Sequence, residues 1–398
     1  MYFDSHKKAE CSGCTACVNA CPVAALKMEP DEEGFLYPVI DESICVNCGL
    51  CRKVCSWEHP QFNNDENPVV LASVLKNKAE LQRSTSGGAF YAIAEWIVLQ
   101  KGVVYGAAFD EHLQLHHISA ETLEELQSIR GSKYLQSKLE VVFKDVEKNL
   151  KLGRWCYFTG TGCQVAGLKA YLRKDYTTLI TSDLVCHGVP SQKIFNEHIS
   201  YMEKKYNDKV ANYYFRDYKL GGGCETCVFA NREPIIKPSY MLSPYLYSFM
   251  YAYTYRYSCY ECRFAHVPRQ GDFTLADFWG IQNYFPDFDI SNGVSLLLIN
   301  SQRGTEIWNK IKGKCTFVVS NITDAARNNC NLVHPSSMPA IRTQIYQEIE
   351  KRGYADVAKK EFKSKDYIKI LIINYILRNP LAQPFLRVYR KMKSTMIR

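Results

Sequence analysis

The chain has 398 residues, of which 46% are hydrophobic and 23% are charged, the balance of a globular protein with two or three domains. The net charge of +8 is concentrated at one end: residues 361–398 carry nine Lys and Arg against two Asp and Glu, which leaves residues 1–360 at +1. A body so close to neutral argues against a nucleic-acid-binding surface, so we expect no nucleic acid partner.

The first ten residues, MYFDSHKKAE, lack the apolar core of a signal peptide. The longest apolar run, ILIINYIL at 370–377, is too short to span a bilayer. We therefore expect a cytoplasmic protein, in which the 17 cysteines serve metal or redox chemistry rather than disulfides.

Two cysteine runs near the N-terminus share the spacing C-x2-C-x2-C-x3-C: CSGCTACVNACP at 11–22 and CVNCGLCRKVCS at 45–56. This spacing is typical of dicluster ferredoxins, in which the fourth cysteine of each run binds the other cluster. Zinc knuckles are the alternative, but zinc sites use ligands in pairs and do not explain triplets with a trailing cysteine. The pattern predicts a domain over 1–62 with two 4Fe-4S clusters, one held by Cys11, Cys14, Cys17 and Cys55 and the other by Cys45, Cys48, Cys51 and Cys21.

Strand and helix signals alternate from about residue 70 to residue 200. We therefore expect an α+β or α/β chain: the ferredoxin-like domain, then an α/β domain with a mixed sheet, then a helical C-terminal tail. Two glycine-containing turns, STSGG at 84–88 and TGTG at 159–162, each precede a predicted helix. Such turns can cradle a phosphate at a helix N-terminus, but plain helix caps have the same composition.

Two further C-x-x-C motifs are not explained by their local sequence. Cys259 and Cys262 form half of a metal site within YSCYECRFAHVPRQGDFTLADFWG at 257–280. Cys224 and Cys227 follow three glycines and could be incidental thiols of a loop, a redox dithiol or a site for another metal. We favour incidental thiols for this second pair.

Several long segments together resemble a known family: TSGGAFYAIAEWIVLQKGVVYGAAFD, RGSKYLQS, FTGTGCQVAGLKAYL, DLVCHGVPS and CYECRFAHVPRQGDFTLADFWGI, in this order. They resemble the beta subunit of coenzyme F420 hydrogenases and dehydrogenases, and the relatives that reduce 7-hydroxymethyl chlorophyll. The resemblance covers roughly residues 1–300. It implies a flavin-binding region over 66–150, a C-terminal region over 151–345 with a third cluster, and a basic helical tail over 346–398.

The resemblance implies that Cys163, Cys186, Cys259 and Cys262 hold the third cluster. The alternative is that the first two are ordinary buried cysteines and the last two a zinc half-site or free thiols. It also implies FAD as a cofactor, and the residues expected to bind it are Ser86, Gly87, Gly88, Gly106, Lys133, Gly160 and Gly162.

Three positions have specific expected roles. Lys133 could stabilise an anionic reduced flavin or bind its pyrophosphate, or it could be a solvated surface lysine. His187 and Asp277 are the catalytic candidates, the first as a proton donor and the second as a group reaching flavin or substrate. A packing histidine and a turn-capping aspartate are the alternatives.

The expected function is an iron–sulfur flavoprotein oxidoreductase. Ferredoxin or another low-potential donor would exchange electrons with the N-terminal clusters, and FAD would reduce or oxidise a small organic substrate. Alternatives are a non-catalytic electron-transfer subunit, an oxidoreductase of reduced coenzyme F420, and a redox sensor. The basic tail could contact a membrane surface or a partner protein, or be a solvated helix.

Overall fold

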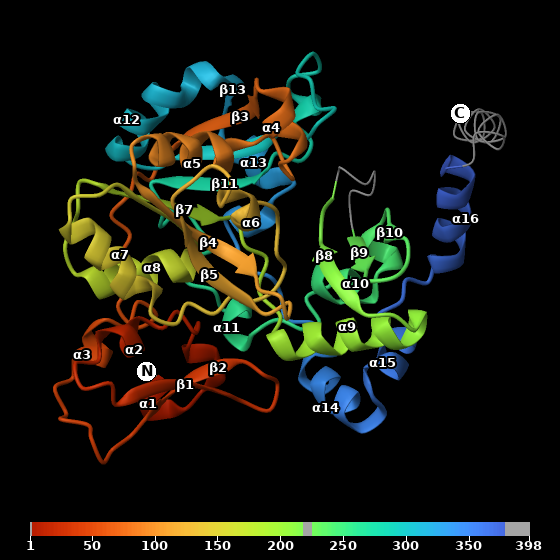
Figure 1. Cartoon of the computed structure of the whole chain (residues 1–398), viewed down its shortest axis with the longest axis horizontal. Helices are drawn as coiled ribbons and strands as arrows, with labels where there is room; N and C mark the ends of the chain where they lie inside the picture. Colours follow the sequence, from red (N-terminus) through yellow and green to blue (C-terminus); the bar gives the residue numbers. More distant parts are fainter. Residues whose placement is uncertain (1, 218–224, 379–398) are drawn as a thin grey trace.

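The computed structural model describes residues 2–217 and 225–378 (Figure 1). An N-terminal module lies against one edge of an α/β body built on an eight-stranded sheet, and an accessory layer of helices and a small sheet lies beside both. The mixed α/β class, the N-terminal ferredoxin-like module and the C-terminal helices that the sequence predicts are confirmed.

The N-terminal module repeats its backbone as it repeats its sequence. Gly13 and Asn47, each two residues after the first cysteine of a run, both have positive φ, as do Thr15 and Gly49 two residues later. Each pair turns the chain before a short helix begins. The elements are α1 (Tyr2–Ser5), the 3-10 helix η1 (Lys8–Glu10), α2 (Ala16–Ala20), the antiparallel pair β1 (Leu26–Pro30) and β2 (Leu36–Ile40), and α3 (Leu50–Lys53).

The large sheet has four parallel strands at its centre and antiparallel strands at both sides. β11, β7, β6 and β4 are the parallel strands, so their carboxyl ends meet at one edge. The order is β13 (Cys315–Ser320), β3 (Val69–Leu75), β12 (Ser295–Ile299), β11 (Phe273–Asp277), β7 (Leu179–Leu184), β6 (Cys156–Thr161), β4 (Val103–Phe109) and β5 (Leu115–Ala120).

Helices cover both faces of this sheet, which is why its central strands are apolar throughout rather than alternating with polar residues. In β6, Tyr157 packs with the core under α5 and α12, while Cys156 and Phe158 pack with the core under α7 and α8. The helices are α4 (Lys78–Gln82), α5 (Ala89–Leu99), α6 (Leu126–Ile129), α7 (Val142–Lys151), α8 (Gly162–Leu172), α12 (Gln302–Ile311) and α13 (Ile322–Arg327), with 3-10 turns η3 (Ile281–Asn283), η4 (Lys312–Lys314) and η5 (Cys330–Leu332).

The accessory layer has its own aromatic core, which includes Phe195, Tyr213 and Tyr245. Its three-stranded antiparallel sheet has the order β10-β9-β8. The elements are α9 (Gln192–Tyr206), β8 (Val210–Tyr214), β9 (Glu225–Phe229), β10 (Ile235–Lys237), η2 (Tyr240–Leu242), α10 (Pro244–Met250), α11 (Tyr257–Tyr260), α14 (Arg342–Arg352), α15 (Tyr354–Lys360) and α16 (Tyr367–Arg378).

The expected regions are joined more closely than separate domains would be. β3, from the 66–150 region, pairs with β12 and β13 of the 151–345 region, so the two regions share one sheet. The boundary at 346 falls inside α14, where Ile345 and Ile349 are buried in the accessory core. The last part of the basic tail, 379–398, lies outside the described residues. None of the helices in the described ranges combines the length and apolarity needed to cross a bilayer.

Candidate cluster and cofactor sites

The candidate site forms where the parallel strands end. Cys163 lies two residues after the end of β6, Cys186 lies two residues after the end of β7, and Asp277 is the last residue of β11. Because neighbouring parallel strands end at the same edge, these three side chains come together although they belong to segments that lie far apart in the sequence.

The first set of four cysteines surrounds one cavity. Cys11, Cys14, Cys17 and Cys55 all line it, together with Trp57. Burial raises the pKa of Cys17 well above its usual range, and the charges of the other three thiols add to the rise. The structure therefore brings together one predicted ligand set, with the trailing cysteine of the second run beside the first run.

The second set lies closer to the surface. Cys48 is exposed, whereas Cys21, Cys45 and Cys51 are half-buried. Burial raises the pKa of Cys51, and the charge of Cys48 adds to the rise. Cys21 accepts a hydrogen bond from a backbone N–H four residues later at 3.2 Å, and Cys45 donates one to Asn47 at 3.7 Å, so both contact their own turns.

The third set also surrounds one cavity. Cys163, Cys186, Cys259 and Cys262 line it. Burial raises the pKa of Cys259 well above its usual range, and the charges of the other three thiols add to the rise. Burial, with the charge of Cys262 adding, raises the pKa of Cys186 to about 12. Four cysteines spread over 100 residues of sequence thus meet on the carboxyl edge of the sheet.

The first and third cysteine sets fit an iron–sulfur cluster better than a single ion. A zinc ion holds its thiolates at about 2.3 Å, which requires the ligands to converge on one point. Within residues 2–217 and 225–378, no three His, Cys, Asp or Glu side chains converge in that way. Four thiolates around a shared cavity are the donor set of a 4Fe-4S cluster.

A large cavity of about 410 Å³ adjoins the third cysteine set. Its volume lies in the range of about 300–1,000 Å³ that is typical of cofactor and substrate sites. The turn at 84–88, the loop at 129–137 and the carboxyl ends of β6, β7 and β11 form its walls. Among the residues expected at the flavin or in catalysis, those that line it are Ser86, Gly88, Lys133, Gly160, His187 and Asp277.

The remaining three glycines lie elsewhere, and packing accounts for each. A Cβ at Gly87 would lie 2.1 Å from the carbonyl oxygen of Ser73, and one at Gly106 would lie 2.3 Å from the side chain of Ile129. Gly162 lines the cavity of the third cysteine set, where a Cβ would lie 3.0 Å from Phe264. These glycines permit close approach of strands, helices and loops.

Lys133 lines the large cavity but directs its ammonium group into the protein. It donates hydrogen bonds to the backbone carbonyls of Ser128, Ile129 and Arg130 at 3.0, 2.9 and 2.7 Å, at the C-terminal end of α6. An ammonium group has three donors, so all of them are occupied. Burial lowers the pKa of Lys133 to about 7. This geometry favours a role in holding the 128–133 loop over contact with a phosphate.

His187 and Asp277 face the same cavity. Burial lowers the pKa of His187, and the charge of Asp277 partly opposes this shift. Asp277 forms an ion pair with Arg216, whose guanidinium group lies 5.7 Å from the centre of the Trp279 ring. The histidine ring stacks on Phe249 with a centroid distance of 6.2 Å. A carboxylate and a neutral imidazole on one cavity wall are the groups that proton transfer to or from a bound molecule uses.

A buried polar network forms another part of the wall, and no sequence motif marks it. The Nε2 of His117 lies 3.0 Å from the carbonyl oxygen of Thr159, and its Nδ1 lies 2.8 Å from the hydroxyl of Ser137. Gln164 donates to the same hydroxyl at 3.0 Å. Burial lowers the pKa of His117 to about 4, so the ring is neutral and its donor faces Thr159. Only the fold reveals this histidine, because its partners come from other segments.

The three cavities form a row. Ser12 and Trp57 line both the first-set and the third-set cavities. Cys163 and Cys186 line both the third-set cavity and the large cavity. The Trp57 ring packs edge-on against Phe264 at a centroid distance of 6.1 Å. Single residues therefore separate each cavity from the next.

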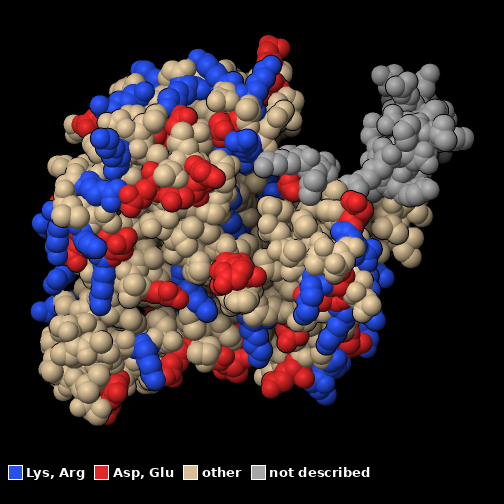
Figure 2. All heavy atoms as spheres, in the orientation of Figure 1, with Lys and Arg blue, Asp and Glu red and all other residues tan. Residues whose placement is uncertain are grey.

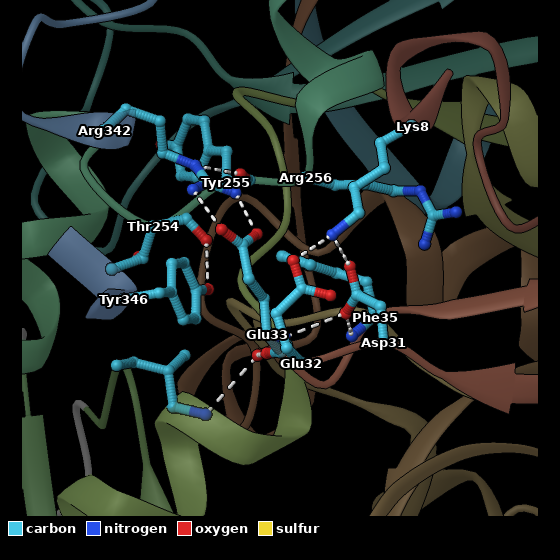
Figure 3. Close-up of polar contacts among 12 residues, drawn as sticks. Lys8, Asp31, Glu32, Glu33, Phe35, Thr254, Tyr255, Arg256, Arg342 and Tyr346 are labelled. Carbon is cyan, nitrogen blue, oxygen red and sulfur yellow. Dashed lines mark hydrogen bonds and ion pairs between the residues drawn. The ribbon is translucent and has the colours of Figure 1, made fainter. Parts of the chain in front are cut away.

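Buried ion pairs and hydrogen bonds hold the N-terminal module against the body (Figure 3). Arg342 of α14 makes a bidentate ion pair with Glu33, at 2.9 and 2.5 Å, and also donates to the carbonyl of Tyr255 at 2.7 Å. Lys8 joins Asp31 to Glu32 on the same loop. The Arg342 contacts thus join the module to the rest of the structure, whereas the Lys8 pairs lie within the module.

Only one cysteine of the second C-x-x-C motif lies within the described residues. Cys227 lies on β9 and is buried in the accessory core, and burial raises its pKa to about 12. A buried thiol of this kind behaves as a small apolar side chain. Cys224, its expected partner, lies outside the described residues.

Comparisons with known proteins find matches to two separate segments of the chain. Residues 153–325 match the family model that describes the C-terminal part of the beta subunit of coenzyme F420 hydrogenase/dehydrogenase. Residues 10–58 match that of the 4Fe-4S dicluster domain. A comparison with curated proteins finds no match.

Among solved structures, a chain of the F420-reducing NiFe hydrogenase complex from Methanosarcina barkeri is similar at 17% identity, with a TM-score of 0.45. That similarity covers 74% of this chain and 92% of the other. The iron–sulfur and oxidoreductase character that the sequence predicts is supported by the two family models. The chain therefore contains a region, residues 153–325, that is similar to the C-terminal part of coenzyme F420 hydrogenase/dehydrogenase beta subunits, and a segment near its N-terminus, residues 10–58, that is similar to the 4Fe-4S dicluster domain.

Proposed function

We propose that this chain is an iron–sulfur flavoprotein oxidoreductase that links a one-electron protein carrier to a two-electron organic substrate. The observation that carries the proposal is the row of three cavities with shared walls. Two of them present four cysteines each, and the third has the size of a cofactor site. Such a row gives single electrons a short path between the surface and a substrate.

The surface end of the path is the second cysteine set. Cys48 is exposed, and Val39, Ile44 and Val46 on the same module expose 40, 48 and 60% of their surfaces. Figure 2 shows that the part of this module at the lower left of the view carries few charged side chains. A ferredoxin or another low-potential carrier is the partner that this end would accept, because electron carriers dock weakly through small interfaces.

The large cavity is the proposed FAD site. Gly88 is the N-cap of α5 and has no side chain to satisfy the first N–H groups of that helix, which begins at the cavity wall. A helix N-terminus of this kind favours a phosphate. When bound, FAD would supply the exchange between single electrons and hydride. The hydroxyl groups of Thr85 and Ser86 lie in the same turn and can donate to a phosphate or a ribityl chain, whereas the Ser84 hydroxyl already donates to the carbonyl of Glu80 at 3.0 Å.

The substrate end is the wall formed by His187, Asp277 and Arg216. His187 is the proposed proton donor or acceptor, because its lowered pKa leaves it neutral near pH 7. Arg216 holds the Asp277 carboxylate, and Trp279 leaves 53% of its surface exposed at the cavity wall. A planar or anionic organic substrate suits this combination of a ring, a cation and an acid–base group.

The test is anaerobic reconstitution followed by analysis of cofactors and turnover. We expect three 4Fe-4S clusters, about twelve iron atoms per chain by the four-thiolate rule, and one FAD. Pairs of one-electron donors and organic acceptors are then screened for turnover, in both directions. Protein that holds its clusters but takes up no flavin would overturn the flavoprotein assignment.

A second candidate is an electron-transfer subunit that acts only within a complex. The description of the matched family as a beta subunit favours it. In that case the isolated chain would reduce bound flavin but turn over substrate only when a partner protein is added. Reduced coenzyme F420 is the alternative substrate. If the isolated chain oxidises it directly, the chain acts as an enzyme on its own; if oxidation needs an added partner protein, the chain is an electron-transfer subunit.

A further inference from the structure

Three arginine side chains of the described residues are fully buried, and one of them lacks a counter-charge. Arg269 lies 3.3 Å from Asp183, and Arg342 forms the ion pair with Glu33. Arg256, with 0% of its surface exposed, has no carboxylate at ion-pair distance within the described ranges. An unpaired buried cation is strongly destabilising, so a nearby anion is required to offset its loss of hydration.

The guanidinium group of Arg256 lies against the first cysteine turn. Its Nε donates to the carbonyl of Cys11 at 2.7 Å, and its Nη1 lies 3.3 Å from the Gln136 side-chain oxygen. A Cβ added to Gly13 would lie 3.0 Å from Nη1. The Tyr37 ring covers one side at 4.0 Å from ring centre to guanidinium carbon.

One donor group of Arg256 is unused. Its Nη2 is buried and has no hydrogen-bond partner among the residues that the structure describes. Native proteins rarely leave a buried donor without an acceptor, because the lost hydration is not replaced. A donor and an unpaired positive charge thus coincide beside the first cysteine set.

Arg256 also connects the first set with the third. It is the N-cap residue of α11, the short helix that carries Cys259. Burial lowers the pKa of Arg256, but the charges of the Cys11 and Cys259 thiols, together with those of Tyr37 and Asp31, outweigh burial and raise it. A single buried cation therefore lies between the two proposed cluster sites.

We propose that Arg256 is a positioning residue that raises the reduction potential of the cluster held by Cys11, Cys14, Cys17 and Cys55. This inference rests on the proposed function, because it requires a cluster at that site. Cluster potentials depend on net charge, on hydrogen bonds to the sulfur atoms and on solvent exposure. When the cluster accepts one electron its negative charge increases, and a fixed cation with a free N–H stabilises the reduced form more than the oxidised form. No proton is transferred, since an arginine stays charged.

The direction of the effect matters for electron flow. The cation whose charge acts on Cys51 of the second set is Arg52, an exposed side chain that is paired with Asp4. The first set instead contacts the buried Arg256 directly. Water screens the exposed cation more strongly than the buried one, so the first cluster should gain more potential. A higher potential at the first cluster favours transfer from the surface cluster inward.

Redox titration of the reconstituted protein, followed by electron paramagnetic resonance of each cluster, tests the proposal. Arg256→Gln should lower the reduction equilibrium constant of the first cluster by about tenfold or more, which is about 59 mV for a one-electron couple. Arg256→Lys keeps the charge and should change that constant by less than about threefold. The potential of the second cluster should change little in either variant.

A second variant leaves the arginine in place. Gln136→Glu puts a carboxylate beside Nη1, which pairs the cation and should lower the potential in the same direction. The control is the double substitution Glu121→Gln and Arg154→Gln, which removes one charge of each sign at the amino end of β6, away from the carboxyl edge of the sheet, and should leave the potential unchanged.

The outcomes separate this inference from the proposed function. If the native protein binds no cluster at the first cysteine set, the proposed function fails. If the cluster forms in all variants and neither Arg256→Gln nor Gln136→Glu shifts its potential, Arg256 is only a structural residue and the inference alone fails. Loss of the cluster in Arg256→Gln leaves Gln136→Glu to decide.

Discussion

His117 illustrates how the cavity wall fixes a protonation state. The ring is buried between the carbonyl of Thr159 and the hydroxyl of Ser137, and burial lowers its pKa to about 4. In the unfolded chain a histidine titrates near about 6.5. The folded protein therefore binds fewer protons than the unfolded chain between these two values, and stability falls as the pH falls from about 6.5 through about 4.

The first prediction concerns this histidine. His117→Gln removes the titrating group, so the part of the acid-induced loss that it causes should disappear. At pH 5 that part is about 2 kcal/mol of the unfolding free energy for a shift of this size. Urea unfolding at pH 5 and pH 8 measures it. Above about pH 7.5 the difference between the variant and the native protein should not depend on pH. An unchanged pH slope in the variant would contradict the neutral, buried state.

The second prediction concerns Lys133. If its ammonium group serves the loop carbonyls of Ser128, Ile129 and Arg130, Lys133→Met should lower the unfolding free energy by about 1–3 kcal/mol. The flavin midpoint potential should change little, because the charge does not face the cofactor. Thermal unfolding and a flavin redox titration of the same preparation measure both. A large shift in potential with unchanged stability would place Lys133 at the flavin instead.

The sequence reveals residue types at fixed spacing, but it does not reveal which way their side chains point or which atoms they contact. The cysteine triplets can be assigned as cluster ligands from the sequence alone, because a cluster needs thiolates at short, regular intervals. The roles of Lys133 and Gly87 depend on which backbone atoms lie opposite, and local sequence does not say where those atoms are. His117 has no local signal at all, since its partners come from two other segments.

At the scale of elements, α8 is the support on which the first cysteine turn rests. Gly167 lies in the middle of this helix, and a Cβ there would lie 2.8 Å from the Cβ and 3.0 Å from the sulfur of Cys14. A glycine in a helix interior costs about 1 kcal/mol relative to alanine. The close approach of the N-terminal module explains why a glycine occupies this position.

The third prediction follows from that contact. Gly167→Ala should destabilise the protein although alanine favours the helix, and it should lower the iron content of the first cluster by displacing Cys14. The matched control is Gly313→Ala in η4, where an added Cβ meets nothing within 4 Å. Thermal unfolding and iron analysis of both variants measure the effects. A Gly167→Ala protein as stable as the control, with full iron, would show that the module has room to shift.

The alternation of strands and helices predicts the parallel centre of the sheet, because a crossover helix separates successive parallel strands. The position of β3 could not be predicted in this way. Its partners β12 and β13 follow it by more than 200 residues, and no local pattern marks a strand that pairs across such a distance. Because β3 pairs with β12 and β13, the regions expected at 66–150 and 151–345 share one sheet.

At the scale of the whole molecule, the attachment of the N-terminal module depends on a buried ion pair with one partner in the module and the other in α14. Glu33 of the module and Arg342 of α14 are each buried and complete one another's hydrogen bonds. Removing one partner leaves the other as an unpaired buried charge, which costs about 3–5 kcal/mol, while removing both costs much less.

The fourth prediction is a double-mutant cycle on this pair. Glu33→Gln and Arg342→Gln should each destabilise the protein strongly, and the double variant should recover a large part of the loss. Denaturant unfolding of the four proteins gives the coupling energy. Simple additivity of the two single effects would mean that the module is not held by this pair.

The last prediction concerns the path from surface to substrate. Cys259 lines the cavity of the third cysteine set, which lies between the first-set cavity and the large cavity. Cys259→Ser replaces a thiolate with a hydroxyl, which is a poor ligand for an iron–sulfur core. The proposed flavin pocket has its own walls, because the turn at 84–88 and the loop at 129–137 do not include Cys259. The variant should therefore still bind FAD.

Stopped-flow measurement of flavin bleaching separates the two half-reactions in this variant. Reduction of FAD by a two-electron donor should survive, while reduction by a one-electron donor through the N-terminal clusters should slow by at least about tenfold. The control is Cys227→Ala, which changes a buried thiol of the accessory core and should leave both rates close to native. Because Cys259 and Cys227 both lie in C-x-x-C motifs, the pair distinguishes a cluster ligand from a packing cysteine. Fast one-electron reduction in the Cys259 variant would mean that electrons reach the large cavity by a route that bypasses the third cysteine set.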